Sequence, residues 1–108
     1  MLRGEVWWVD FDPGKGGEIR KTRPAVIVSN DAANAALNRL QVIPLTSSTG
    51  RVYPSEAVIT VAGKQSKAMA DQLTTASKER LKKRLDALSR SDMQAVERVI
   101  KIQLGLPL

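Results

Sequence analysis

The sequence contains no cysteine and no histidine among its 108 residues. The absence of cysteine excludes disulfides, thiolate metal sites and cysteine nucleophiles, and it suits a reducing compartment. The absence of histidine removes the side chain that most often acts as general acid or base near neutral pH. Any catalysis by this chain must therefore use other side chains.

Long hydrophobic runs are also missing, and no apolar stretch approaches the ~20 residues that span a bilayer. The first residues, MLRGEVWWVDFD, acquire acidic side chains within a few positions, unlike a signal peptide. The length of 108 residues fits one domain over residues 1–108, and the apolar content of 43% disfavours disorder. The sequence therefore predicts a single-domain cytoplasmic protein that contacts no membrane.

Basic residues are in excess. Seventeen Lys and Arg against eleven Asp and Glu give a net charge of +6. Such a surplus favours polyanionic partners such as nucleic acid, because each neutralised phosphate releases condensed counterions. A basic chain without a specific partner is the alternative.

The hydrophobic pattern predicts five or six short strands followed by one helix. The predicted strands cover residues 4–11, 23–29, 39–46, 56–61, 67–72 and, less regularly, 74–77. Asn30 begins a capped helical turn, and Ser89 caps the last helix, which ends at Gly105. This order predicts an α+β fold, a small β-barrel with one C-terminal α-helix.

The glycine-rich segment 14–22 is the first candidate for chemistry. It carries Lys15, Arg20 and Lys21 around one acid, Glu18, and it leads into Arg23 at the start of a buried strand. Glycines let such a loop approach a ligand closely, and a guanidinium on a rigid strand suits a phosphate. A solvated basic loop without specific contacts is the alternative.

Three other segments carry polar or charged side chains that could bind a ligand. Thr46, Ser47 and Ser48 follow an apolar strand and could bind phosphate or base edges, although such hydroxyls also cap turns. Asp71 and Gln72 end the strand predicted at 67–72 and could equally satisfy backbone groups or pair with an arginine. The run KERLKKR at residues 78–84 is a candidate surface for an RNA backbone or a partner, or a solvated face.

Taken in order, these segments resemble the MazF/PemK (Kid) ribonuclease toxins along almost the whole chain. The matching motifs are RGEVWWVDFDP, GGEIRKTRPAVIVSND, VIPLTSS and AMADQL. The resemblance implies an SH3-like β-barrel and a homodimer with single-stranded RNA in a groove across its interface. It further implies cleavage at short motifs by the 2′-hydroxyl of the RNA, without a metal or other cofactor, which leaves a 2′,3′-cyclic phosphate and a 5′-hydroxyl.

The resemblance also implies roles for individual residues. It places the catalytic arginine at Arg23, its partner threonine at Thr46 and further catalytic positions at Glu18 and Asp71. The expected RNA-binding residues are Lys15, Arg20, Lys21, Ser47, Ser48, Gln72 and Arg80. A reference pKa above ~12 makes an arginine a poor base, so we expect Arg23 to stabilise the phosphate. The general base is left open between Glu18, Asp71 and water.

The chain differs from the PemK branch of this family at two positions. The PemK branch uses a histidine and an arginine at positions that Gly17 and Met69 occupy here. The sequence therefore favours the MazF-like arrangement around Arg23 and Thr46.

The resemblance implies a cognate antitoxin with an acidic segment, through which the complex would bind operator DNA. Two alternatives stand beside this function. A CcdB-like gyrase poison needs a tryptophan near the C-terminus, but the chain ends IKIQLGLPL and its tryptophans are Trp7 and Trp8. A non-catalytic RNA-binding barrel would fit the charge and the strand pattern.

Overall fold

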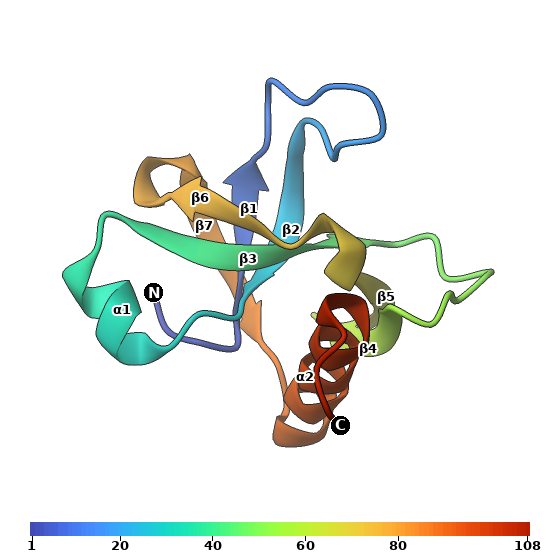
Figure 1. Cartoon of the computed structure of the whole chain (residues 1–108). Coiled ribbons are helices and arrows are strands. Elements are labelled where there is room, and N and C mark those ends of the chain that lie inside the picture. Colours follow the sequence, from blue (N-terminus) through green and yellow to red (C-terminus); the bar gives the residue numbers. More distant parts are fainter.

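The computed structural model describes residues 1–108, in which a curled β-sheet is followed by a C-terminal helix (Figure 1). The strands are β1 (Glu5–Asp10), β2 (Thr22–Ile27), β3 (Arg39–Thr46), β4 (Glu56–Val61), β5 (Lys64–Met69), β6 (Thr74–Ser77) and β7 (Leu81–Ala87). The α-helices are α1 (Asp31–Ala36) and α2 (Arg90–Leu104), and two 3₁₀ turns are η1 (Ala70–Gln72) and η2 (Lys78–Arg80).

The strands pair antiparallel in the order β4-β5-β3-β2-β1-β7, and β6 also pairs with β3. The sheet curls around two groups of buried apolar side chains. The larger group joins β4 and β5 to α2 through residues such as Ile59 and Val96, both about 1% exposed or less. The smaller group, which includes Val9 and Leu40, lies between β1, β2, β3 and β6. This half-barrel with a C-terminal helix confirms the predicted fold class.

Two carboxylates occupy the outer edge of β4. The backbone N–H of Ala62 donates to Asp86 of β7 at 2.7 Å, and that of Thr60 donates to Asp92 of α2 at 2.9 Å. These bonds satisfy edge groups that would otherwise face an unpaired side of the sheet. The amides of Ala62 and Ala87 hold the pKa of Asp86 below its ordinary value of 3.8, against a smaller opposing effect of burial.

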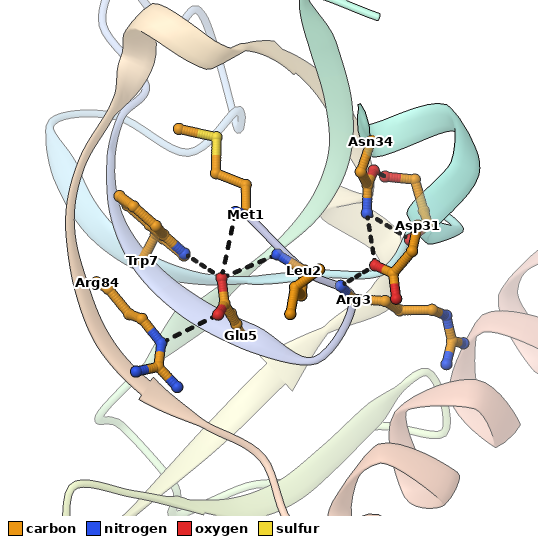
Figure 2. A network of polar contacts seen from close by, with 9 residues as sticks. Met1, Leu2, Arg3, Glu5, Trp7, Asp31, Asn34 and Arg84 are labelled. Carbon is orange, nitrogen blue, oxygen red and sulfur yellow. Dashed lines mark hydrogen bonds and ion pairs between the residues drawn. The ribbon is translucent and has the colours of Figure 1, made fainter. Parts of the chain in front are cut away.

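A second polar network fixes the start of the chain (Figure 2). The Glu5 carboxylate accepts hydrogen bonds from Leu2 N–H at 2.9 Å and from the Trp7 indole at 3.0 Å, and it pairs with Arg84 at 3.2 Å. Burial works to raise the pKa of Glu5. These hydrogen bonds, with the charges of the N-terminus and Arg84, outweigh it and lower the pKa below 4.5.

The helix caps agree with the sequence. Ser89 accepts a hydrogen bond from Asp92 N–H at 3.1 Å, and Gly105 ends α2 with φ +69°. Asn30 likewise caps α1 by accepting from Ala33 N–H. Neither α1 nor α2 has both the length and the apolar character that a bilayer crossing requires.

Two parts of the predicted strand pattern are wrong. The strand predicted at 67–72 ends at Met69, and Ala70–Gln72 forms a 3₁₀ turn. The basic run at 78–84 is not a featureless charged face, because β7 begins within it at Leu81. Two register shifts against β1 interrupt the period-two alternation there, which is why the pattern did not reveal the strand.

Candidate active site

Arg23 and Thr46 line one open depression of about 300 Å³. Arg23 is the second residue of β2 and Thr46 is the last residue of β3, so both backbones belong to the sheet. Both side chains are half-buried, and neither is hidden in the core. The depression is also lined by Trp8, Lys21, Thr22, Pro24, Leu45, Ser47 and Ser66.

The Arg23 guanidinium is oriented but not neutralised. Its Nε donates to the Arg20 carbonyl oxygen at 3.0 Å, which fixes the plane of the group. None of the ion pairs of the chain involves Arg23. Its two terminal nitrogens therefore remain available for an anion such as phosphate.

Thr46 supplies a second donor to the same depression. Its Oγ1 accepts a hydrogen bond from the Ser48 amide at 3.2 Å, so the hydroxyl proton is free to point elsewhere. Ser47 is exposed beside it, whereas Ser48 lies outside the depression and shapes the turn through its amide. A cationic group and a hydroxyl donor thus line one depression of about 300 Å³.

A buried ion pair supports the end of β3. Lys67 lies directly opposite Thr46 in the β3–β5 register and is 7% exposed. Its Nζ lies 3.1 Å from Glu56 Oε1, donates to the Arg51 carbonyl oxygen at 2.7 Å and lies 5.9 Å from the centre of the Tyr53 ring. This cluster ties the segment after Thr46 to β4 and β5.

The loop of residues 12–21 is tied down from outside by two side chains. The Gln72 amide donates to the Gly17 carbonyl at 3.1 Å and accepts from Ile19 N–H at 3.3 Å. Arg80 Nη1 donates to the carbonyl oxygens of Asp10 at 2.9 Å and Asp12 at 2.7 Å. Gln72 and Arg80 are both expected to bind RNA. In the structure, the side-chain amide of Gln72 and Nη1 of Arg80 bind the backbone of the loop and position it.

Contacts within the loop restrict it further. Asp12 accepts from Lys21 N–H at 2.8 Å, which stabilises Lys21 at φ +67°, a conformation that L-residues rarely adopt. Glu18 accepts from Lys15 N–H at 2.8 Å. A Cβ at Gly14 would lie 2.5 Å from the Ile19 carbonyl oxygen, so the loop requires glycine there. The side chains of Lys15, Arg20 and Lys21 are exposed, as expected.

Glu18 and Asp71 do not line the Arg23–Thr46 depression. They share a second one, of about 380 Å³, with Phe11, Gln72 and Arg80 among others. The separation has a physical cause, because Gln72 anchors the Gly17–Ile19 segment and so turns Glu18 towards η1 and β6. The four residues expected to be catalytic therefore form two pairs.

Sequence reasoning missed Trp8. This indole is 36% exposed and lines the depression beside Arg23 and Thr46. Adjacent residues of a strand point to opposite faces, so one of two neighbouring tryptophans should face outward. That rule could have singled out the pair Trp7–Trp8 as a source of one exposed aromatic surface.

Comparison with known proteins identifies the family of this chain. Residues 2–104 match the model of a family described as the PemK-like, MazF-like toxin of type II toxin–antitoxin systems. The chain belongs to the PemK/MazF toxin family. It is also 39% identical over 115 residues to endoribonuclease MazF9 of Mycobacterium tuberculosis, a match that covers 98% of both chains.

Solved PemK/MazF structures agree with the fold. A mycobacterial endoribonuclease in complex with its cognate antitoxin superposes with a TM-score of 0.84 at 27% identity, covering 100% of this chain and 98% of that one. MazF of Deinococcus radiodurans gives a TM-score of 0.86 at 25% identity, with 98% and 97% covered. The predicted family and fold are confirmed, and the names of these relatives agree with the predicted endoribonuclease.

Proposed function

We propose that this PemK/MazF toxin is an endoribonuclease that cleaves single-stranded RNA at short sequence motifs. The observation that carries the proposal is the depression in which an unpaired Arg23 guanidinium and the Thr46 hydroxyl face a common space. The naming of MazF9 as an endoribonuclease supports the same activity.

In the proposed reaction, the 2′-oxygen of the RNA attacks the adjacent phosphorus. The new O2′–P bond forms as the P–O5′ bond breaks, which leaves a 2′,3′-cyclic phosphate and a 5′-hydroxyl. Negative charge develops on the phosphorane oxygens and on the departing 5′-oxygen. Arg23 stabilises both by charge-assisted hydrogen bonds, and Thr46 donates one more; each such donor is commonly worth ~10²–10³-fold in rate.

Proton transfer is assigned to solvent. Glu18 and Asp71 line the other depression and not the one that Arg23 and Thr46 line. In this proposal water takes the proton of the 2′-hydroxyl and returns one to the 5′-oxygen. The proposed scheme uses no metal ion.

Cleavage of a mixed-sequence RNA in the presence of EDTA tests the activity directly. We expect 2′,3′-cyclic phosphate ends in EDTA and loss of cleavage in Arg23→Ala, with RNA binding weakened but measurable because Lys15, Arg20 and Lys21 remain. Arg98→Ala, on the exposed side of α2, is the matched control. Full cleavage by Arg23→Ala would contradict the assignment. Binding without cleavage by the unmodified protein would favour a non-catalytic RNA-binding barrel.

We further propose a cytoplasmic homodimer that a cognate antitoxin neutralises. The complex of the related mycobacterial endoribonuclease with its antitoxin supports this partner. The charge of +6 suits an acidic antitoxin segment folding over the loop of residues 12–21. Operator DNA would then be bound through the antitoxin. Sedimentation of the free chain and co-purification with the neighbouring gene product test the dimer and the antitoxin.

A further inference from the structure

We propose that the RNA strand continues from the Arg23–Thr46 depression over Trp8 and onto Lys83, across strands β1 and β7. This inference rests on the proposed function, and it names the residues that bind the nucleotide next to the cleaved phosphate. Trp8 provides a stacking surface for a base, and Lys83 provides the charge for the following phosphate.

The strand register places these residues in one row. Trp8 is paired with Pro24 of β2 on one side and with Lys83 of β7 on the other. Residues directly opposite each other in an antiparallel pair project from the same face of the sheet. Pro24 and Trp8 both line the Arg23–Thr46 depression. The row therefore leads from that depression outward to the edge strand.

Trp7 and Trp8 differ in what they contact. The Trp7 indole donates to Glu5 and its ring packs on the smaller core cluster, as Figure 2 shows for the hydrogen bond. Trp8 is 36% exposed, although an aromatic side chain of this size gains most when it is covered. An exposed indole at the Arg23–Thr46 depression suits the face of a nucleobase, because base–aromatic stacking tolerates any sequence.

The basic residues of β7 also differ in what their side chains contact. Lys82 Nζ donates to the Glu79 carbonyl oxygen at 3.0 Å, and Arg84 pairs with Glu5 at 3.2 Å. Lys83 lies between them, is exposed and takes part in none of the four ion pairs of the chain. Among the three basic residues of β7, Lys83 is thus the one whose side chain has neither a hydrogen bond nor an ion pair, and it lies opposite Trp8.

The spacing fits a nucleotide strand. Neighbouring strands are roughly 4.8 Å apart, so β7 lies about 10 Å from β2. A phosphate at Arg23 and another near Lys83 leave room between them for one base on Trp8. The positive charges at the two ends match the polyanion, and the aromatic face matches the base between them.

The test measures binding separately from cleavage. The probe is a mixed-sequence single-stranded RNA carrying 2′-O-methyl groups, which cannot be cleaved because the nucleophile is blocked. Its Kd is measured by fluorescence anisotropy over a range of salt concentrations. We compare Trp8→Ala, Trp8→Phe and Lys83→Gln with the unmodified protein. Lys64→Gln, an exposed lysine at the β4–β5 turn, is the matched control.

We expect Trp8→Ala to weaken binding roughly 5- to 150-fold and Trp8→Phe to retain most of the affinity. Lys83→Gln should lower the slope of log K against log salt by about 0.7, as loss of one phosphate contact to a single strand requires. Lys64→Gln should leave the slope unchanged. Equal affinity in Trp8→Ala and the unmodified protein, or equal slopes in Lys83→Gln and Lys64→Gln, would overturn the proposal.

Two further measurements distinguish RNA binding by this row from a subunit contact and from a failure of the proposed activity. If Trp8→Ala or Lys83→Gln changes the oligomeric state in sedimentation, the row contacts a second copy of the chain and the proposal is overturned. Cleavage of unmodified RNA in EDTA is measured on the same preparations. Its absence in the unmodified protein contradicts the proposed function, whereas normal cleavage with unaltered probe binding in the variants contradicts this inference alone.

Discussion

The Gln72 side-chain amide donates a hydrogen bond to the Gly17 carbonyl oxygen, 55 residues earlier in the sequence, at 3.1 Å. Together with the bond from Ile19 N–H, this contact sets the conformation of the loop of residues 12–21, whose last residue precedes β2. The loop in turn provides the Arg20 carbonyl that orients the Arg23 guanidinium. Gln72 is therefore a positioning residue that acts on Arg23 through the loop.

Replacing Gln72 by alanine should release the loop without removing a group that contacts the cleaved phosphate. Since a misplacement of ~1 Å can cost on the order of 10²-fold, we expect kcat to fall roughly 10- to 100-fold with a smaller change in Tm. Gln94→Ala, an exposed glutamine of α2, is the matched control. A purely structural role would instead lower Tm and leave the kcat of the folded fraction unchanged.

The rate of cleavage should depend on the hydroxyl proton of Thr46 and not on its methyl group. Thr46→Val has nearly the same shape but cannot donate to the phosphate, so we expect kcat to fall roughly 10²-fold. Thr46→Ser keeps the donor and should retain most of the activity. The two rates are compared under single-turnover conditions, where equal activity of the valine and serine variants would remove Thr46 from the mechanism.

The Lys67–Glu56 ion pair should behave as a buried pair, since its side chains are 9% and 10% exposed. Glu56→Gln leaves the Lys67 charge uncompensated, and we expect the free energy of unfolding to drop by about 3–5 kcal/mol. The double variant Glu56→Gln, Lys67→Met removes both charges and should recover much of that loss. Urea denaturation measures each value, and additive effects in the double variant would show that the two groups are not coupled.

Asp86 should make stability depend on pH in the acid range. Its pKa is lowered in the folded state by the Ala62 and Ala87 amides, so its contribution is fully present above the unfolded value near 3.8. That contribution is lost as pH falls through the lower folded pKa. In Asp86→Asn, which carries no charge at any pH, the free energy of unfolding should decline less steeply below pH 4. An identical decline in both proteins would contradict the role of Asp86 at the edge of β4.

Local signals in the sequence were sufficient for much of the fold. Short segments rich in apolar and strand-forming residues located β1 to β4, and the Ser89 cap and Gly105 located the ends of α2. The sequence did not reveal β7 because bulges disrupt the alternation of apolar and polar residues along it. Its three consecutive basic residues, 82–84, also show no apolar face. Such bulges depend on the partner strand β1, which a local pattern does not contain.

The sequence predicted only part of the arrangement of the candidate site. The resemblance pairs Arg23 with Thr46, and the structure places Arg23 near the start of β2 and Thr46 at the end of the adjacent strand β3. The position of Glu18 instead depends on contacts between the loop and Gln72, which no spacing rule relates to residue 18. The exposed face of Trp8 likewise depends on which of two neighbouring indoles finds an acceptor in Glu5.

The contact of Arg80 with the carbonyl oxygens of Asp10 and Asp12 joins residues that are 70 and 68 positions apart. During synthesis, Arg23 and Thr46 leave the ribosome long before the side chains that fix the loop beside them. A nascent chain therefore carries the residues assigned to cleavage without their final geometry until most of its length has been translated. The loop beside Arg23 thus acquires its two anchoring side chains only after Arg80 has been synthesised.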